Sequence, residues 1–425
     1  MLWAPDEWGQ GIAVETPSGA ISCRDLGVMS RRAADELGLA RGERVGIALP
    51  PGLDFALALH ACLSAGIVAV PLDVRAPREV WPLGGLAAVI DRPLECAGDE
   101  AAPAERALDE VVVVLRTSGT SGTPREVPLT FANFIWSAIG SAVALGFDPQ
   151  ERWLCTLPLV HVGGLSILVR SALYGSTAVV HERFDAALAV EALMDRGITL
   201  VSVVATTLLR LLDAGLERPP ALRCALAGGG PVPAALVERA KTAGVVLAQT
   251  YGLTETCSQV ATQVPGQAST ANAGPRLFCT QVEIAADGEI VVSGPTLSPA
   301  TGGRLLTGDL GELDADGNLR VIGRKADTII TGGENVAPAE VEAVLCEHPA
   351  VVEAGVFALA DPEWGEAVNA AVVLRAATAV DELRRHCARR LAPYKVPKTI
   401  AVVEALPRTA SGKLLRRELA SAAGL

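Results

Sequence analysis

Alternating apolar and polar runs divide much of the chain into short strands and helices. Residues 198–204 (ITLVSVV) are apolar and β-branched, which predicts a buried strand, and an amphipathic helix follows and ends at Gly215. Residues 222–252 read as strand, glycine turn, helix, strand. This alternation is typical of crossover units on a mostly parallel sheet, so we expect an α/β fold.

The N-terminal part follows a related pattern. Residues 31–50 predict a helix and then a short strand, and the runs 87–91 and 111–116 are apolar and β-branched. The most apolar stretch, 55–71, contains His60 and Ser64 and is too short and too interrupted to span a membrane. We interpret it as a buried helix followed by a strand.

Past the middle the pattern changes. Residues 280–294 and 311–323 each predict two strands joined by an Asp-Gly turn, which indicates a smaller antiparallel subdomain. The remaining chain predicts an α+β unit of about 100 residues. Its expected elements are a helix (338–347), strands (351–358 and 369–374) and a helix (380–391).

Composition narrows the function classes. A length of 425 residues suggests two or three domains. The net charge of −12 argues against a nucleic-acid partner, because phosphate binding needs a basic face. The first ten residues lack the basic and apolar regions of a signal peptide, and the nine cysteines form no CxxC pair. We therefore expect reduced thiols in a cytoplasmic protein.

The segment 117–125 (TSGTSGTPR) combines hydroxyl groups with two glycines. It is not a Walker A loop, because the glycines are three residues apart and the only cation is Arg125. The hydroxyls and inward-turned backbone N–H groups suit a clamp for a polyphosphate, although a surface Ser/Gly turn is the alternative. The predicted phosphate-binding residues are Thr117, Ser118, Gly119, Thr120, Ser121, Gly122, Thr123 and Arg125.

A second cluster, 249–259 (QTYGLTETCSQ), follows a predicted strand. Tyr251 beside Gly252 is suited to stacking on a flat ring, Thr254 to donating to a phosphate oxygen, and Glu255 to holding Mg²⁺. The alternative is a helix N-cap formed by Thr254 or Thr256.

Three more polar residues lie towards the C-terminus. Asp309 follows a Thr-Gly turn and could accept from both hydroxyls of a ribose, and Arg324 ends a hairpin. Lys413 follows Ser-Gly before a basic helix, in a chain with five lysines and 31 arginines. That rarity indicates a need for a compact charge at position 413. A turn aspartate, a solvated arginine and a helix-terminal lysine are the alternatives.

In this order and spacing the clusters resemble the adenylate-forming superfamily of acyl-CoA synthetases, from 63–72 (LSAGIVAVPL) to the C-terminal SGK. The resemblance implies a large N-terminal domain, 1–325, of two parallel-type α/β subdomains and a β-subdomain. It also implies a small, mobile α+β C-terminal domain, 326–425.

The implied chemistry joins a carboxylic acid to coenzyme A through an acyl-adenylate, with ATP and Mg²⁺. Lys413 would touch the attacking carboxylate and the α-phosphate, Glu255 would ligate Mg²⁺, and Tyr251 would pack on adenine. The remaining nucleotide contacts implied are Gly228, Gly229, Gly230, Gly252, Asp309 and Arg324, with Thr254 and His161 in catalytic roles. Two positions depart from the family pattern: Arg125 replaces the usual lysine, and Ala326 stands at the hinge position.

The segment 157–175 carries no aspartate for a substrate amine and instead presents His161, two glycines and a predicted apolar helix. With 182–212 it resembles the o-succinylbenzoate–CoA ligases of menaquinone synthesis, which implies 2-succinylbenzoate as the acid. The candidate partners for its second carboxylate are His161, Arg170, Ser202, Thr206, Arg210, Ser258 and Gln259.

Other functions stay open at this point. They are a general aryl- or fatty-acyl-CoA ligase, a non-catalytic nucleotide- or acyl-binding paralogue, and a kinase, which would release ADP. The expected partners are small molecules, with no membrane span, and the protein is expected to be a monomer or a homodimer.

Overall fold

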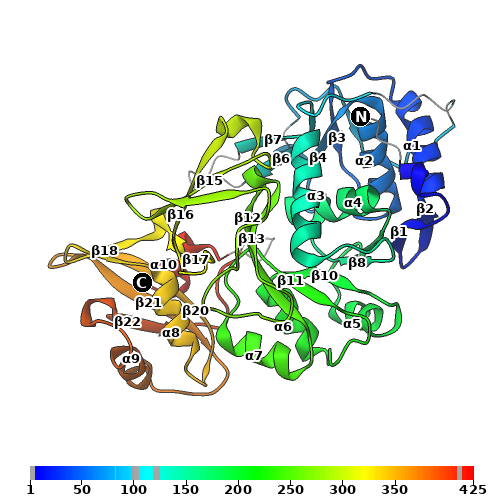
Figure 1. The fold of residues 1–425 in the computed structure, drawn as a ribbon. Helices are drawn as coiled ribbons and strands as arrows, with labels where there is room; N and C mark the ends of the chain where they lie inside the picture. The colour runs from blue at the N-terminus through cyan, green and yellow to red at the C-terminus, as the bar shows by residue number, and fades with distance from the viewer. Residues whose placement is uncertain (1–4, 82, 98, 100–104, 118–124, 409–413) are drawn as a thin grey trace.

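The computed structural model describes residues 5–81, 83–97, 99, 105–117, 125–408 and 414–425. Its N-terminal three-quarters hold two mainly parallel sheets, and the C-terminal quarter forms a separate body at the lower left of Figure 1. The predicted α/β fold with a smaller α+β domain is confirmed.

The larger sheet has eight strands within the described residues. Its strands are parallel except for the β12–β13 and β1–β2 pairs. In spatial order they are β13 (Ser258–Thr262), β12 (Leu247–Leu253), β11 (Cys224–Ala227), β10 (Leu200–Val203), β8 (Arg152–Cys155), β9 (Thr177–Val180), β1 (Ile12–Thr16) and β2 (Gly19–Ser22).

The second parallel-type sheet ends in a hairpin whose connection is the predicted phosphate loop. Its order is β5 (Ala88–Ile90), β3 (Arg44–Ile47), β4 (Val68–Pro71), β6 (Val111–Thr117) and β7 (Arg125–Thr130), and only the β6–β7 pair is antiparallel. Residues between β6 and β7 lie outside the described part of the chain.

Helices cover both sheets. Those of this region are α1 (Cys23–Leu37), α2 (Leu53–Ala65), α3 (Phe131–Leu145), α4 (Val162–Tyr174), α5 (Ala186–Asp195), α6 (Ala205–Asp213) and α7 (Ala234–Thr242). Every residue of α2 from Phe55 to Ser64 is buried, which explains why that segment is apolar on all sides. The predicted buried helix and following strand (β4) are confirmed.

The antiparallel subdomain consists of β14 (Gln281–Ile284), β15 (Glu289–Ser293), β16 (Arg304–Leu313) and β17 (Leu319–Arg324), which pair in sequence order. Both predicted hairpins are present. The short η5 turn (Lys325–Asp327) leads from β17 into the C-terminal body.

The C-terminal body has the strand order β19 (Glu334–Val336), β18 (Ile329–Thr331), β21 (Gly365–Leu374) and β20 (Val351–Asp361), with β22 (Thr399–Val402) also on β21. Its helices are α8 (Pro338–Cys346), α9 (Val380–Ala388) and α10 (Leu419–Ala422). The helix expected at 380–391 ends three residues early, at Ala388.

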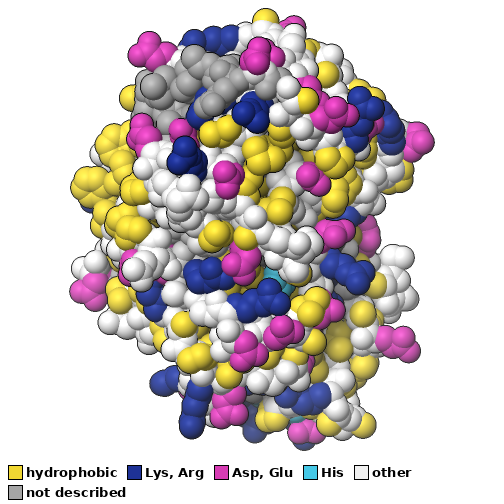
Figure 2. All heavy atoms as spheres, turned by 90° about the vertical axis from the view of Figure 1, so that its right-hand side faces the viewer, with side chains coloured by type: hydrophobic (Ala, Val, Ile, Leu, Met, Phe, Trp, Pro, Cys, Tyr) yellow, Lys and Arg dark blue, Asp and Glu magenta, His cyan; other side chains and the backbone are white. Residues whose placement is uncertain are grey.

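The surface carries both signs of charge, and Figure 2 shows acidic and basic side chains interspersed over one face. In the described parts of the chain, no helix is long and apolar enough to cross a bilayer. The cysteines seen in the structure are all free thiols.

Candidate functional site

Four neighbouring parallel strands, β8, β10, β11 and β12, direct their carboxyl ends to one edge of the larger sheet. In open α/β sheets, ligands bind at this edge. The segments that follow these strands hold many of the predicted site residues: His161, Thr206, Gly228, Gly229, Gly230, Thr254 and Glu255. The fold thus brings together groups that are almost 100 residues apart in sequence.

His161 lies between β8 and α4, where its backbone carbonyl accepts from Leu165 N–H at 3.0 Å. The prediction that the helix follows the two glycines was wrong, because α4 starts at Val162 and includes both. A side chain at Gly164 would bring its Cβ within 2.6 Å of the Pro158 carbonyl oxygen, so this turn needs glycine.

The loop after β4 also reaches this edge. Arg75 chiefly, and His161 to a smaller extent, hold the pKa of Asp73 below its usual value. His161 therefore lies within electrostatic reach of Asp73, which comes from the other parallel sheet.

A second group joins the end of β12 to the antiparallel subdomain. Tyr251 Oη donates to Asp309 Oδ2 at 2.7 Å, and Arg324 Nε lies 2.7 Å from Asp309 Oδ1. Burial and the Asp309 charge raise the pKa of Tyr251, so its hydroxyl stays protonated and donates. The structure thus places together three residues that the sequence assigned to one nucleotide.

Asp309 is held by an irregularity within β16, which corrects the prediction that it follows a turn. Residues 307–309 bulge opposite Ile290 between two stretches of regular pairing. Gly308 has a φ of +71°, which favours glycine, and its N–H donates to Glu289 Oε1 at 2.8 Å. The bulge therefore fixes the direction of the Asp309 side chain.

The chain past Arg324 is anchored on both sides of Ala326. Lys325 Nζ contacts Asp287 Oδ2 at 2.6 Å and Glu289 Oε2 at 2.9 Å on the β14–β15 hairpin. These two carboxylates raise the pKa of Lys325. On the other side, Asp327 accepts from Arg416 Nε at 3.1 Å, and Arg416 belongs to the C-terminal body.

The candidates for the second carboxylate differ in burial. Ser202 is buried and accepts from Trp153 Nε1 at 3.0 Å, whereas Thr206 and Ser258 are partly exposed near the strand ends. Gln259 is buried, and its Oε1 has no hydrogen-bond partner among the described residues. These side chains remain candidates.

The two arginines proposed for this role are placed very differently. Arg170 is 2% exposed and donates to Ser137 Oγ at 2.8 Å, while Arg210 is exposed near the end of α6. Helix α6 begins beside the strand ends, and Arg210 lies near its other end, so among the candidates the position of Arg210 supports this role least.

Two predicted elements fall outside the described residues: Ser118–Thr123 of the phosphate loop, and Lys413. The flanks of the loop are described. Thr117, the last residue of β6, pairs directly with Arg125, the first residue of β7, so the predicted loop joins two neighbouring antiparallel strands.

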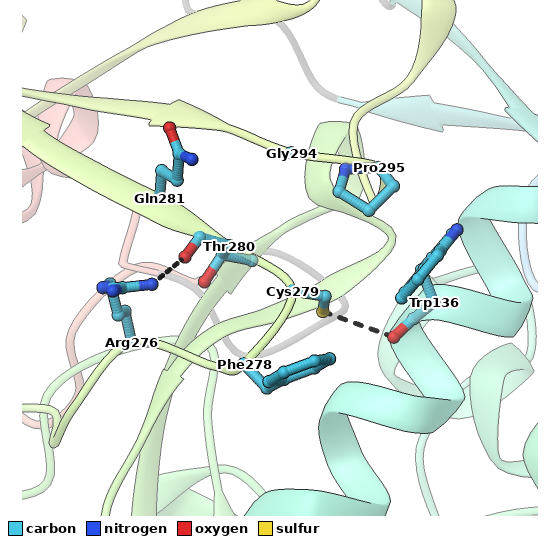
Figure 3. Close-up of a pocket in the computed structure, with 8 residues that line it drawn as sticks. All are labelled: Trp136, Arg276, Phe278, Cys279, Thr280, Gln281, Gly294 and Pro295. Atoms are coloured by element: carbon cyan, nitrogen blue, oxygen red, sulfur yellow. Dashed lines mark hydrogen bonds between the residues drawn. The ribbon is translucent and has the colours of Figure 1, made fainter.

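A pocket of about 280 Å³ lies elsewhere, between α3 and the start of the antiparallel subdomain (Figure 3). Trp136 and Phe278 lie on two sides of it, and Cys279 Sγ donates to the Trp136 carbonyl at 3.3 Å. None of the predicted site residues that the structure describes lines this pocket. The site is defined instead by the strand ends and the Tyr251–Asp309–Arg324 group.

Sequence reasoning missed the residues that support the site. Glu289 contacts both Gly308 and Lys325, but its position in an Asp-Gly-Glu hairpin carries no signal for that role. Lys325 could have been found, because lysine is rare in this chain.

Comparisons with known proteins agree with this geometry. The AMP-binding enzyme family matches residues 3–81 and 84–300, and the AMP-binding enzyme C-terminal domain matches 340–413. The 2-succinylbenzoate–CoA ligase of Bacillus cereus is 39% identical over 90% of this chain and 89% of its own.

Solved structures of the o-succinylbenzoate CoA synthetase of Bacillus subtilis are also similar. The complex with the acyl-adenylate OSB-AMP has 35% identity and a TM-score of 0.90, covering 98% of this chain and 97% of that chain. The complex with ATP and magnesium has 35% identity and a TM-score of 0.88, covering 98% of each chain. A double mutant of that enzyme bound with its product analogue OSB-NCoA has 35% identity and a TM-score of 0.72, covering 99% of this chain and 98% of that chain.

The family models cover most of the chain, and the similar ligase exceeds 30% identity over nearly its whole length. The strand-end segments and the Tyr251–Asp309–Arg324 group lie within the matched region. The chain belongs to the AMP-binding enzyme family.

Proposed function

We propose that this chain is an ATP-dependent acid–CoA ligase whose acid is 2-succinylbenzoate, a reactant of menaquinone synthesis. The observation that carries the proposal is the meeting of Tyr251, Asp309 and Arg324 beside the strand ends that hold Glu255 and His161. The names of the similar proteins support the choice of acid.

The reaction has two steps. A carboxylate oxygen of the acid bonds to the α-phosphorus of ATP, and the bond to the β-phosphate breaks, releasing pyrophosphate. The sulfur of coenzyme A then bonds to the acyl carbon, the acyl–oxygen bond breaks, and AMP leaves with the thiol proton going to solvent. The first step brings two anions together, so it needs positive charge, which we assign to Lys413 and Arg125.

For the nucleotide, Asp309 and Arg324 would bind the ribose, Tyr251 would pack on adenine, and Gly228–Gly230 would border it. Asp309 fits this role because it is held rigidly by a buried bulge. A fixed carboxylate can accept from two neighbouring ribose hydroxyls without reorganising.

Magnesium fits the donors that are present. Among the described residues no group of three or more His, Cys, Asp or Glu side chains could hold a metal by itself. Mg²⁺ commonly binds one or two carboxylates and completes its coordination shell with phosphate oxygens and water. The single carboxylate of Glu255 is therefore suited to an ion that arrives together with ATP. Bound there, the ion would neutralise charge on the phosphates.

We place the domain boundary at Lys325–Ala326, giving an adenylation domain (1–325) and a mobile C-terminal domain (326–425). Lys325 is anchored to the β14–β15 hairpin and Asp327 to Arg416, so Ala326 is the residue between the two anchors. The higher TM-score to the OSB-AMP complex than to the OSB-NCoA complex supports a rotation between the two steps. We also propose a cytoplasmic location, consistent with the free thiols.

The choice of acid is tested with a panel. Thioester formation with ATP, Mg²⁺ and coenzyme A should be measured for 2-succinylbenzoate, its amide at the non-reacting carboxylate, benzoate and decanoate. We expect kcat/KM to be highest for 2-succinylbenzoate and to fall strongly for the amide, because a site built for a charged group rejects an analogue that lacks it. An amide or decanoate that reacts equally well would contradict this choice and indicate a general acyl-CoA ligase.

A further inference from the structure

The turn that carries Glu255 is backbone-strained. After the η3 turn (Thr254–Thr256), Cys257 has a φ of +51° and Ser258 a φ of +101°, and neither is glycine. Such conformations cost about 1–3 kcal/mol each and persist only where the surroundings hold them. The question is which contacts hold this turn.

One contact comes from α3. Ser137 is 1% exposed, and its Oγ lies 2.6 Å from the Cys257 carbonyl oxygen and 2.8 Å from Arg170 Nη2. A guanidinium only donates, so the hydroxyl accepts from Arg170 and its single hydrogen goes to the carbonyl. The direction of this chain of hydrogen bonds is therefore fixed.

Arg170, which donates the hydrogen bond to Ser137, is an unusual residue for a protein interior. Arg170 lies in the interior over the ring of Trp153, and among the described residues it forms no ion pair with a carboxylate. A buried charge is costly without a partner. In this position it polarises the Ser137 hydroxyl and strengthens the bond to Cys257, since linked hydrogen bonds reinforce one another in a low-dielectric interior.

Other contacts restrain the same turn without involving α3. The Ser298 N–H donates to the Glu255 carbonyl at 2.8 Å, and Thr256 Oγ1 donates to the Leu253 carbonyl at 3.0 Å. A Cβ at Gly252 would lie 1.7 Å from the Ser258 carbonyl oxygen, so the two strands meet closely there. Ser137 supplies the side-chain hydrogen bond to Cys257, the first of the two strained residues.

We propose that Ser137, backed by Arg170, is a positioning residue that fixes the 254–258 turn and so aims the Glu255 carboxylate at the metal–phosphate complex of the nucleotide. This rests on the proposed function. Neither residue has to touch the nucleotide. Their effect passes through the Cys257 carbonyl to the backbone two residues from Glu255.

The test compares two serines of one helix. Ser141 lies one turn after Ser137 and is equally buried, but among the described residues its Oγ forms no hydrogen bond, to the turn or to any other group. Ser137→Ala and Ser141→Ala remove the same atom from the same helix. ATP affinity is measured by titration calorimetry with Mg²⁺ and again with EDTA, without the acid, so any acid contact of Arg170 does not contribute.

We expect Ser137→Ala to lower the Mg²⁺-dependent gain in ATP affinity roughly three- to tenfold, about the worth of one hydrogen bond. Arg170→Met should lower it less, and Ser141→Ala should leave it unchanged. Equal effects of the two alanine variants, or no effect of Ser137→Ala, would overturn the positioning role and leave the proposed function standing. A wild-type protein that does not bind ATP at all would overturn both.

Discussion

Replacing Asp309 by asparagine should weaken ATP binding strongly while the fold persists. In the free protein Asp309 accepts from Tyr251 and pairs with Arg324, both at 2.7 Å, and it is 5% exposed. Hydrogen bonds to a charged group contribute about 1.5–3 kcal/mol and neutral ones about 0.5–1.5 kcal/mol. Asparagine keeps the shape and loses the charge, so each affected bond weakens by about 1 kcal/mol.

Two such bonds in the free protein give a loss of about 2 kcal/mol in the free energy of unfolding, measured by urea titration. The two expected ribose bonds give a further loss of about 2 kcal/mol in ATP binding, or roughly 30-fold in Kd, measured by titration calorimetry. The control is Asp314→Asn, on the same hairpin, whose exposed carboxylate accepts from the Asn318 N–H at 2.8 Å. It should leave the Kd for ATP within about twofold.

If the Asp309→Asn protein is folded and binds ATP as tightly as the wild type, Asp309 does not hold the nucleotide. An equal loss of affinity in Asp314→Asn would show instead that the hairpin as a whole, and not this carboxylate, matters.

Three further predictions concern other parts of the chain. Lys413→Ala should slow acyl-adenylate formation roughly 10²–10³-fold, by analogy with the loss of one oxyanion donor. Thioester formation from supplied adenylate should slow far less. Equal slowing of both steps would contradict a role of Lys413 that is confined to adenylate formation. Burial lowers the pKa of His60 from 6.5 to about 3, so between these pH values the unfolded chain binds more protons than the folded chain. The contribution of His60 to stability should therefore be full above about pH 6.5 and fall by about 1.4 kcal/mol per pH unit as the pH drops towards 3. Urea titrations of His60→Leu should lack that part of the slope, and an unchanged slope would mean that His60 is not the titrating group. Burial raises the pKa of Cys62 in α2 and of Cys155 in β8 to about 12, so iodoacetamide should label both thiols slowly in the native protein and rapidly in urea. Rapid labelling of the native protein would show instead that α2 and β8 open readily.

Much of the fold follows from local patterns. The apolar run that became α2 and β4 and the two Asp-Gly hairpins are visible in sequence because burial and turn chemistry act over a few residues. The bulge that holds Asp309 was not predicted, because it depends on pairing with β15, and neither strand carries the pairing register in its own sequence.

The candidate residues were chosen from short motifs and their family pattern, whereas the residues that support them carry no such local signal. Tyr251 and Arg324 were selected by their motif positions and the family pattern, and the structure joins both to Asp309. Ser137 is a serine in an apolar helix, and only the approach of Cys257, 120 residues later in the chain, gives it a role. Contacts at such separation are set by tertiary packing, which local patterns do not encode.

Isotope transfer tests the central claim most directly. The protein should be incubated with ATP, Mg²⁺, coenzyme A and 2-succinylbenzoate labelled with ¹⁸O in its carboxylates, and the products analysed by mass spectrometry. An acyl-adenylate mechanism predicts AMP that carries one ¹⁸O atom, because the attacking carboxylate oxygen stays on the α-phosphorus when the thioester forms. Formation of ADP, with ¹⁸O in inorganic phosphate and none in AMP, would contradict it.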